Sequence, residues 1–328
     1  MSRLNISLYT ILALIAFAAN SVLCRLALGD NTIDAASFTW VRLLSGMLVL
    51  IIILAFTRSS LGSSFSRTES KSPSQDEQDN LQGTSAADAL SLSKSKAKGS
   101  WRAAILLFIY AITFSFAYIS LATGMGALIL FASVQLTMVI ASLLSGKKLH
   151  YTEWIGLIMA FCGFIYLVMP TLATPSLSGF ILMTISGIAW AGYTLMGRGS
   201  ASALGDTSYN FLRTLPFVIL LILVTFQDAQ LSNTGLALAI VSGGLASGIG
   251  YTIWYIALTG LSSIQAAVVQ LVVPVIAAIG GIIFAGESIS MRLILASAMI
   301  LGGILFLIVG KYVLESRGSR HTKENESN

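Results

Sequence analysis

Charged residues are scarce in this chain. Only 10% of its 328 residues are Asp, Glu, Lys or Arg, 55% are apolar, and the mean hydropathy is +0.84. A water-soluble domain carries roughly 25% charged residues, so the composition excludes a soluble enzyme, a disordered chain and a nucleic-acid-binding domain. The net charge of +5 does not indicate a nucleic-acid partner, because the basic residues lie in loops and tails between apolar runs.

Cysteine, histidine and catalytic motifs are also sparse. Cys24 and Cys162 both lie inside apolar runs, which excludes a disulfide framework. His150 and His321 lie in a loop and in the tail, so we expect no metal site. The sequence contains no zinc-protease, serine-hydrolase, aspartyl-protease or nucleotide-binding motif. We therefore expect no enzymatic activity and no cofactor.

Long apolar runs dominate the chain instead. A helix needs about 20 apolar residues to cross a bilayer core of ~30 Å, and ten runs qualify. They do not alternate between polar and apolar residues, as membrane β-strands would, so the sequence predicts an all-α integral membrane protein. Weak breaks near 122 and 258–262 leave nine or eleven spans open. The ten expected transmembrane helices are 6–28, 36–57, 102–121, 124–145, 152–170, 177–197, 207–226, 234–257, 263–285 and 290–312.

The first apolar run has a second interpretation. Arg3 and the segment Ala16-Phe17-Ala18 resemble a signal peptide and its cleavage site. The run continues to Leu28, which is too far for a signal peptide, so we interpret it as a membrane span.

The placement of Lys and Arg predicts the orientation, because these residues gather on the cytoplasmic side of cell membranes. With ten spans and the N-terminus in the cytoplasm, sixteen of the 19 Lys and Arg residues lie inside and three lie outside. The opposite orientation would invert this ratio. We therefore expect a multi-pass protein of the cell (inner or plasma) membrane with both termini in the cytoplasm.

Residues 58–100 form the one long hydrophilic segment. They are rich in Ser, Lys, Asp, Glu and Gln and have almost no aromatic residues. Such a composition buries too little apolar surface to offset the entropy of ordering. We expect a disordered cytoplasmic insert here, and the tail from Glu315 onward has the same character.

The two halves of the chain share landmarks in the same order. FAANSVLCR at 17–25 resembles WAGYTLMGR at 190–198, and SFTWVR at 37–42 resembles SYNFLR at 208–213. Two shorter matches follow, 118–121 with 255–258 and 134–136 with 269–271.

Each half holds five expected helices, and an odd number gives the two halves opposite orientations. This is the inverted repeat of many secondary transporters, which places a binding site near mid-membrane between the halves. We expect the first five-helix repeat at 6–170, the second at 177–312 and a cytoplasmic tail at 313–328.

Loosely spaced motif residues run through the apolar spans: Asn20, Arg25, Arg42, Pro274, Gly286-Glu287 and Gly302-Gly303. Over about 6–311, the sequence resembles the EamA-type transporters of the drug/metabolite transporter superfamily. The resemblance implies ten helices in two inverted repeats and the export or uptake of a small metabolite. It also implies a central cavity lined by helices one to four and six to nine, with helices five and ten at the periphery. The chain departs from the family at Gly146-Lys147, where a Gly-Glu pair usually ends the fourth helix.

Polar and aromatic side chains inside the apolar runs are the candidate site. A buried amide needs a partner, and a zwitterion or polyol would provide one. Hydrogen bonds between helices would also explain the amides, and packing would explain the aromatic residues. The candidate substrate-binding residues are Asn20, Tyr118, Gln135, Trp190, Tyr193, Trp254 and Gln270.

Four arginines near the expected helix ends leave two interpretations open. One is an anion site. The other, which we favour, is snorkelling to lipid headgroups or pairing with nearby aspartates. The four are Arg25, Arg42, Arg198 and Arg213, and the aspartates are Asp30, Asp34 and Asp206.

The expected function is that of a secondary transporter. The acids nearest to mid-membrane, Glu153 and Glu287, lie at helix ends, which disfavours an acidic proton relay and a strongly cationic substrate. We expect alternating-access transport of a small neutral or zwitterionic metabolite, an amino acid or related compound. A non-transporting scaffold or sensor acting through the cytoplasmic insert is the alternative. The expected partners are the metabolite and the lipid bilayer, with a monomer and a homodimer both open.

The orientation can be tested by cysteine labelling. In a chain without its native cysteines, Asp88→Cys should be cytoplasmic and Asn31→Cys external, because of the asymmetric distribution of Lys and Arg. A membrane-impermeant maleimide added to intact cells should label only position 31. Labelling of position 88 under the same conditions would overturn the assignment.

Overall fold

The described part of the chain is almost entirely helical. The computed structural model describes residues 3–69, 99–146, 151–169, 176–197, 202–261 and 263–326. Among these residues no strand forms, and a single β-bridge joins Ile33 to Leu231. The prediction of an all-α protein is therefore confirmed.

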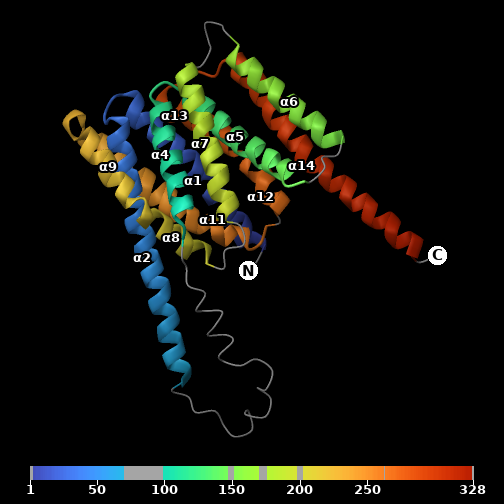
Figure 1. The fold of residues 1–328 in the computed structure, drawn as a ribbon, viewed down its shortest axis with the longest axis horizontal. Coiled ribbons are helices and arrows are strands. Elements are labelled where there is room, and N and C mark those ends of the chain that lie inside the picture. Colours follow the sequence, from blue (N-terminus) through green and yellow to red (C-terminus); the bar gives the residue numbers. More distant parts are fainter. Residues whose placement is uncertain are drawn as a thin grey trace.

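Apart from the stretch between Glu69 and Trp101, only a few residues separate consecutive helices (Figure 1). The first half holds α1 (Arg3–Gly29), α2 (Ala35–Glu69), α4 (Trp101–Tyr118), α5 (Thr123–Leu144) and α6 (Tyr151–Val168). The second half holds α7 (Leu177–Gly197), α8 (Ala203–Arg213), α9 (Leu215–Thr225), the short turn η2 (Phe226–Asp228), α10 (Asn233–Ile240), the π-helical segment η3 (Val241–Ile249), α11 (Gly250–Leu258), α12 (Ser263–Gln270), α13 (Val273–Ala285) and α14 (Met291–Glu326).

The membrane-spanning prediction agrees with these helices. Within the described ranges, 9 helices are long and apolar enough to cross a membrane, and Tyr151–Leu167 is a shorter apolar helix. They follow the order of the ten expected runs. The seventh, eighth and ninth spans are each composed of consecutive helical segments: α8 with α9, α10 with η3 and α11, and α12 with α13.

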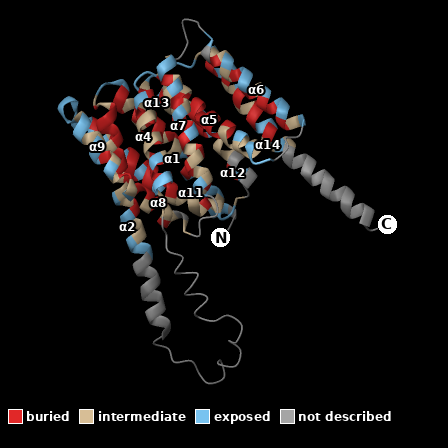
Figure 2. Ribbon diagram, in the orientation of Figure 1, coloured by how far each residue is buried: buried red, intermediate tan, exposed pale blue. Residues whose placement is uncertain are grey.

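The outer surface is apolar, as a lipid-facing surface must be. Large aliphatic and aromatic side chains are exposed on the outer helices, among them Ile158 and Ile165 on α6, Leu223 on α9 and Phe284 on α13. Buried residues concentrate between α1, α4, α5 and α7 (Figure 2). The chain therefore has apolar side chains on both sides of its outer helices, which is why their sequences show no amphipathic stripe.

Two prolines explain where the composite spans break. Pro216 lies at the start of α9, directly after α8, and Pro274 lies at the start of α13. Proline has no backbone N–H and clashes with the carbonyl four residues earlier, so it cannot continue a helix that precedes it. In the ninth span, the N–H groups of Leu271 and Val272 bond carbonyls only three residues back. This tight turn leaves Gln270 at the end of a half-helix inside the span.

Two helices are longer than expected. α2 continues to Glu69, so the first residues of the segment expected to be disordered from 58 are helical, and α14 continues to Glu326 through most of the expected tail. No proline follows position 274, and the first proline after α2 is Pro73, so neither helix meets a strong breaker. The remainder of the insert, 70–98, lies outside the described residues.

α6 and α14, the fifth and tenth spans, pack on each other at one side of the bundle (Figure 1). A Cβ atom at Gly156 would lie 2.4 Å from the Gly303 carbonyl oxygen, and one at Gly303 would lie 2.6 Å from the Gly156 carbonyl oxygen. The two backbones are therefore in direct contact, a packing mode that small residues allow in membranes.

This contact predicts different outcomes for two adjacent glycines. Gly303→Ala should lower the free energy of unfolding by about 1–3 kcal/mol, because the added methyl group must push two backbones apart. Gly302→Ala is the matched control, since the nearest atom to its Cβ would be the flexible Met159 Cε at 3.6 Å. Thermal unfolding of the purified variants measures the difference. Equal melting temperatures for both would contradict the close α6–α14 contact.

Candidate functional site

A cavity of about 430 Å³ opens between the helices of the two halves. Its rim includes Gly197 at the end of α7 and Thr259 after α11, both of which are exposed, so the cavity reaches the surface at this end of the bundle. Its volume falls within the range of ~300–1,000 Å³ typical of small-molecule sites. Its lining residues are Phe17, Val134, Met138, Trp190, Tyr193, Thr194, Gly197, Asp206, Thr207, Asn210, Tyr251, Trp254, Tyr255, Leu258, Thr259 and Gln270.

A smaller cavity of about 30 Å³ lies beside it and shares four of its residues, Phe17, Trp190, Tyr251 and Gln270. This inner cavity has room for about two or three water molecules, since one needs roughly 10–15 Å³. Its other lining residues are Asn20, Ser21, Tyr110, Phe114, Leu130, Phe131, Ala246 and Ser247. The two spaces together form one site with a wide outer part and a narrow inner part.

Aromatic rings form the boundary between the two parts. The Trp190 ring stacks on Tyr193 and Tyr251, with centroid distances of 5.4 and 5.3 Å, and lies 4.8 Å from the Tyr110 ring. The Phe17 and Trp254 rings meet edge to face, with their centroids 5.7 Å apart. An aromatic face that remains open to the cavity carries negative electrostatic potential and attracts an ammonium group.

A polar network lies behind this wall. Arg42 Nη2 donates to the Tyr110 hydroxyl oxygen at 2.8 Å, and Asn20 Nδ2 approaches the same oxygen at 3.5 Å. The Ser242 hydroxyl donates to Asn20 Oδ1 at 2.5 Å. The network joins α1, α2, α4 and η3. The π-helical segment η3 can approach α2 closely enough to join this network, because Gly243 has no side chain and lets the η3 backbone contact the Arg42 carbonyl.

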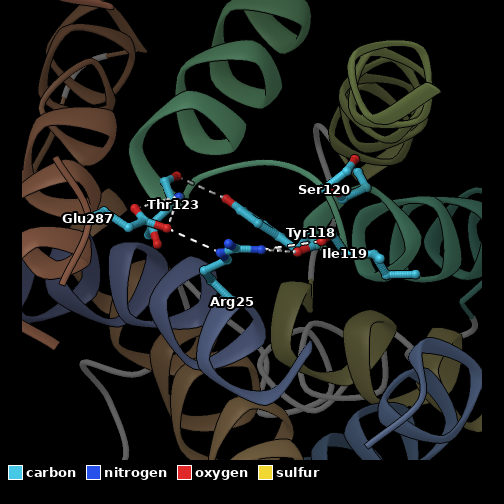
Figure 3. Close-up of polar contacts among 7 residues, drawn as sticks. Arg25, Tyr118, Ile119, Ser120, Thr123 and Glu287 are labelled. Atoms are coloured by element: carbon cyan, nitrogen blue, oxygen red, sulfur yellow. Dashed lines mark hydrogen bonds and ion pairs between the residues drawn. The ribbon is translucent and has the colours of Figure 1, made fainter. Parts of the chain in front are cut away.

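The far end of the bundle, which neither cavity reaches, contains an ion pair (Figure 3). Arg25 Nε lies 3.2 Å from Glu287 Oε1, and Arg25 Nη1 also donates to the carbonyls of Tyr118 and Ile119 at 3.1 and 3.3 Å. The Thr123 N–H donates to both Glu287 oxygens, at 3.0 and 2.8 Å. Both members of the pair therefore hold the backbone of the α4–α5 connection.

The sequence positions Glu287 for this role. α13 ends at Gly286, whose φ of 62° is in the left-handed region that glycine tolerates. The Glu287 N–H then returns to the Gly281 carbonyl at 3.1 Å, which turns the carboxylate toward α5. Gly286 thus ends α13, and the turn that it makes places the carboxylate of Glu287.

The cavities bring together five of the seven predicted site residues. Asn20 lines the inner cavity, Tyr193 and Trp254 line the outer one, and Trp190 and Gln270 line both. Tyr118 lines neither. It is fully buried at the closed end, where its hydroxyl donates to the Thr123 carbonyl. Gln135 is buried on α5 and also lines neither cavity, although its neighbour Val134 lines the outer one.

The favoured interpretation of two arginines is wrong. Arg25 pairs with Glu287 instead of a nearby aspartate, and Arg42 is only 2% exposed, so neither snorkels to a headgroup. Asp34 instead accepts from the N–H of Ser37 at the start of α2. Arg213 lies over the Trp101 ring at 6.0 Å, and Arg198 lies outside the described residues.

Several lining residues were not predicted, and their signals were visible in part. Tyr110 and Phe114 belong to an i, i+4 aromatic stripe on one face of α4, and Tyr251 is one turn before Tyr255. Asn210 lies in the repeated SYNFLR segment. Only the packing shows which of the aromatic residues face the cavity.

Comparisons with known proteins agree with this architecture. The sequence model of the EamA-like transporter family matches residues 177–309. An uncharacterized protein of Pseudomonas aeruginosa is 42% identical over 92% of this chain and 93% of its own length. An uncharacterized transporter of Archaeoglobus fulgidus is 22% identical over 61% of this chain and 73% of its own length. A crystal structure with 16% identity covers 90% of this chain and 94% of its own, with a TM-score of 0.55, and shows the fold alone.

Membrane-spanning helices around an aromatic and polar cavity define a multi-pass membrane protein of the transporter class. More narrowly, the chain belongs to the EamA-like transporter family and is a membrane transporter of the drug/metabolite transporter type.

The closed end yields a testable consequence. Glu287→Gln removes the charge that binds Arg25, and it should expose the inner cavity from this end, with roughly a 5- to 150-fold shift of the conformational equilibrium. Ser21→Cys, in a chain without native cysteines, reports the change, because Ser21 lines the inner cavity. An impermeant maleimide should label it faster in the Glu287→Gln background.

The control is Arg292→Gln, at the start of α14. Arg292 bonds the Tyr166 carbonyl and lines neither cavity, so this variant should lower the melting temperature without changing the labelling rate. An unchanged labelling rate in Glu287→Gln would show that the ion pair does not close this end.

Proposed function

We propose that this transporter moves a small neutral or zwitterionic metabolite, an amino acid or a related compound, across the cell membrane by alternating access. The observation that supports the proposal best is the asymmetry of the site. The cavity reaches the surface at the Gly197 and Thr259 end, and the Arg25–Glu287 pair closes the other end.

The distribution of Lys and Arg supports an assignment of the two ends. It places the end of α1, and with it the Arg25–Glu287 pair, on the external side, and the end of α7 on the cytoplasmic side. The described conformation is then the inward-facing one. Transport requires the opposite conformation, in which the ion pair separates and the cytoplasmic end closes.

The helix contacts support two halves that move relative to one another. The main contacts between the halves come in matching pairs: α1 packs on α11 and α13, while α7 packs on α4 and α5. Similarly, α2 packs on η3 while α8 packs on α4, and α6 pairs with α14. This exchange pattern is what a two-fold axis between inverted repeats requires. The repeat interpretation remains a prediction.

The chemistry of the lining supports the substrate class. An aromatic lining suits an ammonium group wherever a ring face is open to the cavity, and the amides of Asn20 and Gln270 can serve as donor and acceptor. Asp206 lines the wide outer part of the cavity, and none of the described residues that line the inner cavity is an acid. A dication would meet no deep counter-charge there, whereas a zwitterion supplies both charges itself.

The proposal is tested by substrate counterflow. Purified protein in liposomes loaded with a mixture of the twenty L-amino acids should accumulate at least one external radiolabelled amino acid. Gln270→Leu should weaken its apparent affinity roughly five- to two-hundred-fold, because a ligand polar group loses its buried partner.

Gln135→Leu is the matched control, since this amide is buried on α5 but lines neither cavity. It should retain near-normal flux. Absence of counterflow for the whole mixture would contradict the substrate class, and equal effects of the two substitutions would contradict the site. A scaffold or sensor would give no flux with any solute.

A further inference from the structure

Arg42 is a buried charge that has no acidic partner in the described part of the chain. It is the eighth residue of α2 and is 2% exposed. Its guanidinium carbon lies 5.2 Å from the Tyr110 ring centroid and 4.8 Å from that of Phe114. Nη2 donates to the Tyr110 hydroxyl, and Nη1 has no hydrogen-bond partner among the described residues. An ionised group in a membrane interior is costly unless another charge or dipole compensates it.

The hydrogen bonds around Tyr110 are directed so that a donor remains. The Tyr110 oxygen accepts from Arg42 and lies within reach of the Asn20 amide, so its own hydroxyl hydrogen is used by neither. Tyr110 lines the inner cavity. A hydroxyl that accepts from a guanidinium is polarised and becomes a better donor. The positive charge of Arg42 therefore acts on the inner cavity indirectly, by strengthening the Tyr110 hydroxyl as a hydrogen-bond donor.

A second unsatisfied group faces the same space. The Ser247 hydroxyl, on η3, is buried, lines the inner cavity and has no partner in the described part of the chain. It comes from a different helix than Tyr110, so two separate elements contribute a hydroxyl-bearing residue to the lining of the inner cavity. Two available hydroxyls and an uncompensated guanidinium form a site for an anion.

We infer that the transported metabolite carries a carboxylate, which binds in the inner cavity to the Tyr110 and Ser247 hydroxyls, with Arg42 supplying the compensating charge. The inference rests on the proposed function and names the group that the site recognises. Arg42 acts through Tyr110 as a positioning residue. The ammonium group of a zwitterion then lies toward the aromatic wall and the outer cavity, which Asp206 also lines.

The test compares ligands that differ only at the carboxyl group. The twenty L-amino acids, their carboxamides and a set of simple carboxylates (acetate, lactate, succinate, benzoate) are added at millimolar concentration to the full-length protein in lipid nanodiscs. Thermal unfolding should show stabilisation by at least one carboxylate, and the matched carboxamide should bind at least tenfold more weakly. Stabilisation by no carboxylate, or equal stabilisation by the amide, would overturn the inference.

The variants test the charge separately from the fold. Arg42→Gln should reduce the carboxylate affinity roughly 10- to 150-fold and abolish the preference over the amide, while Arg42→Lys should keep part of that preference. Ser247→Ala should weaken binding of the carboxylate more than binding of the amide.

The control is Arg213→Gln, at the position that matches Arg42 in the second half, because Arg213 lines neither cavity. If Arg42→Gln lowers the melting temperature but keeps the preference for the carboxylate over the amide, Arg42 has a structural role only. If Arg42→Gln does not fold, the carboxylate preference of Arg42→Lys and Ser247→Ala decides whether the inference holds.

Counterflow separates this inference from the proposed function. Carboxylate binding that depends on Arg42, without flux of any solute, would support the site and contradict transport of this class. Flux that is equally fast for a carboxylate and its amide, and insensitive to Arg42→Lys and Ser247→Ala, would support transport and overturn the carboxylate site.

Discussion

The lipid bilayer offers the backbone no hydrogen-bond partner, and the architecture follows from that constraint. Regular helices satisfy their own N–H and C=O groups, so irregular backbone is tolerated only where protein or a cavity surrounds it. Two of the irregular segments among the described spans, those of the eighth and ninth spans, obey this rule. The turn before Pro274 carries Gln270 to both cavities, and the π-helical η3 packs against α2 through Gly243. The irregular backbone and the site are therefore in the same place.

The number and order of the spans could be predicted from the sequence because hydropathy reports whether a segment is apolar over about 20 residues. The direction of a side chain on such a helix could not. Gln135 and Tyr118 are surrounded by apolar residues on every face, so no amphipathic stripe marks the side that meets the cavity. Their sequence matches to Gln270 and Tyr255 indicate related positions, but only Gln270 and Tyr255 line a cavity. The repeated segments of the sequence therefore indicate the region of the site, whereas helix packing determines which of their residues line a cavity.

Two arginines of similar sequence context have different partners, and this difference organises the site. Arg25 has a carboxylate, Glu287, which a glycine cap places opposite it, and the pair closes one end of the bundle. Among the described residues, the guanidinium of Arg42 contacts the Tyr110 hydroxyl and two aromatic faces and no carboxylate. Both side chains lie near helix ends in the sequence, so charge counting alone treats them alike. What separates them is whether the fold brings an acid within reach, which depends on contacts more than sixty residues apart in the chain.

A ligand can drive a conformational change only if it binds two conformations unequally. The network around Tyr110 joins α2 and α4 of the first half to η3 of the second, and Asn20 of α1 is part of it. A substrate held there touches both halves, so movement of one half against the other must change its contacts. The Arg25–Glu287 pair lies at the opposite end and binds the α4–α5 connection, not the ligand. In the proposed transport cycle, α4 would couple ligand binding to separation of the Arg25–Glu287 pair, because α4 carries Tyr110 and Arg25 donates to the carbonyls of Tyr118 and Ile119 at its end.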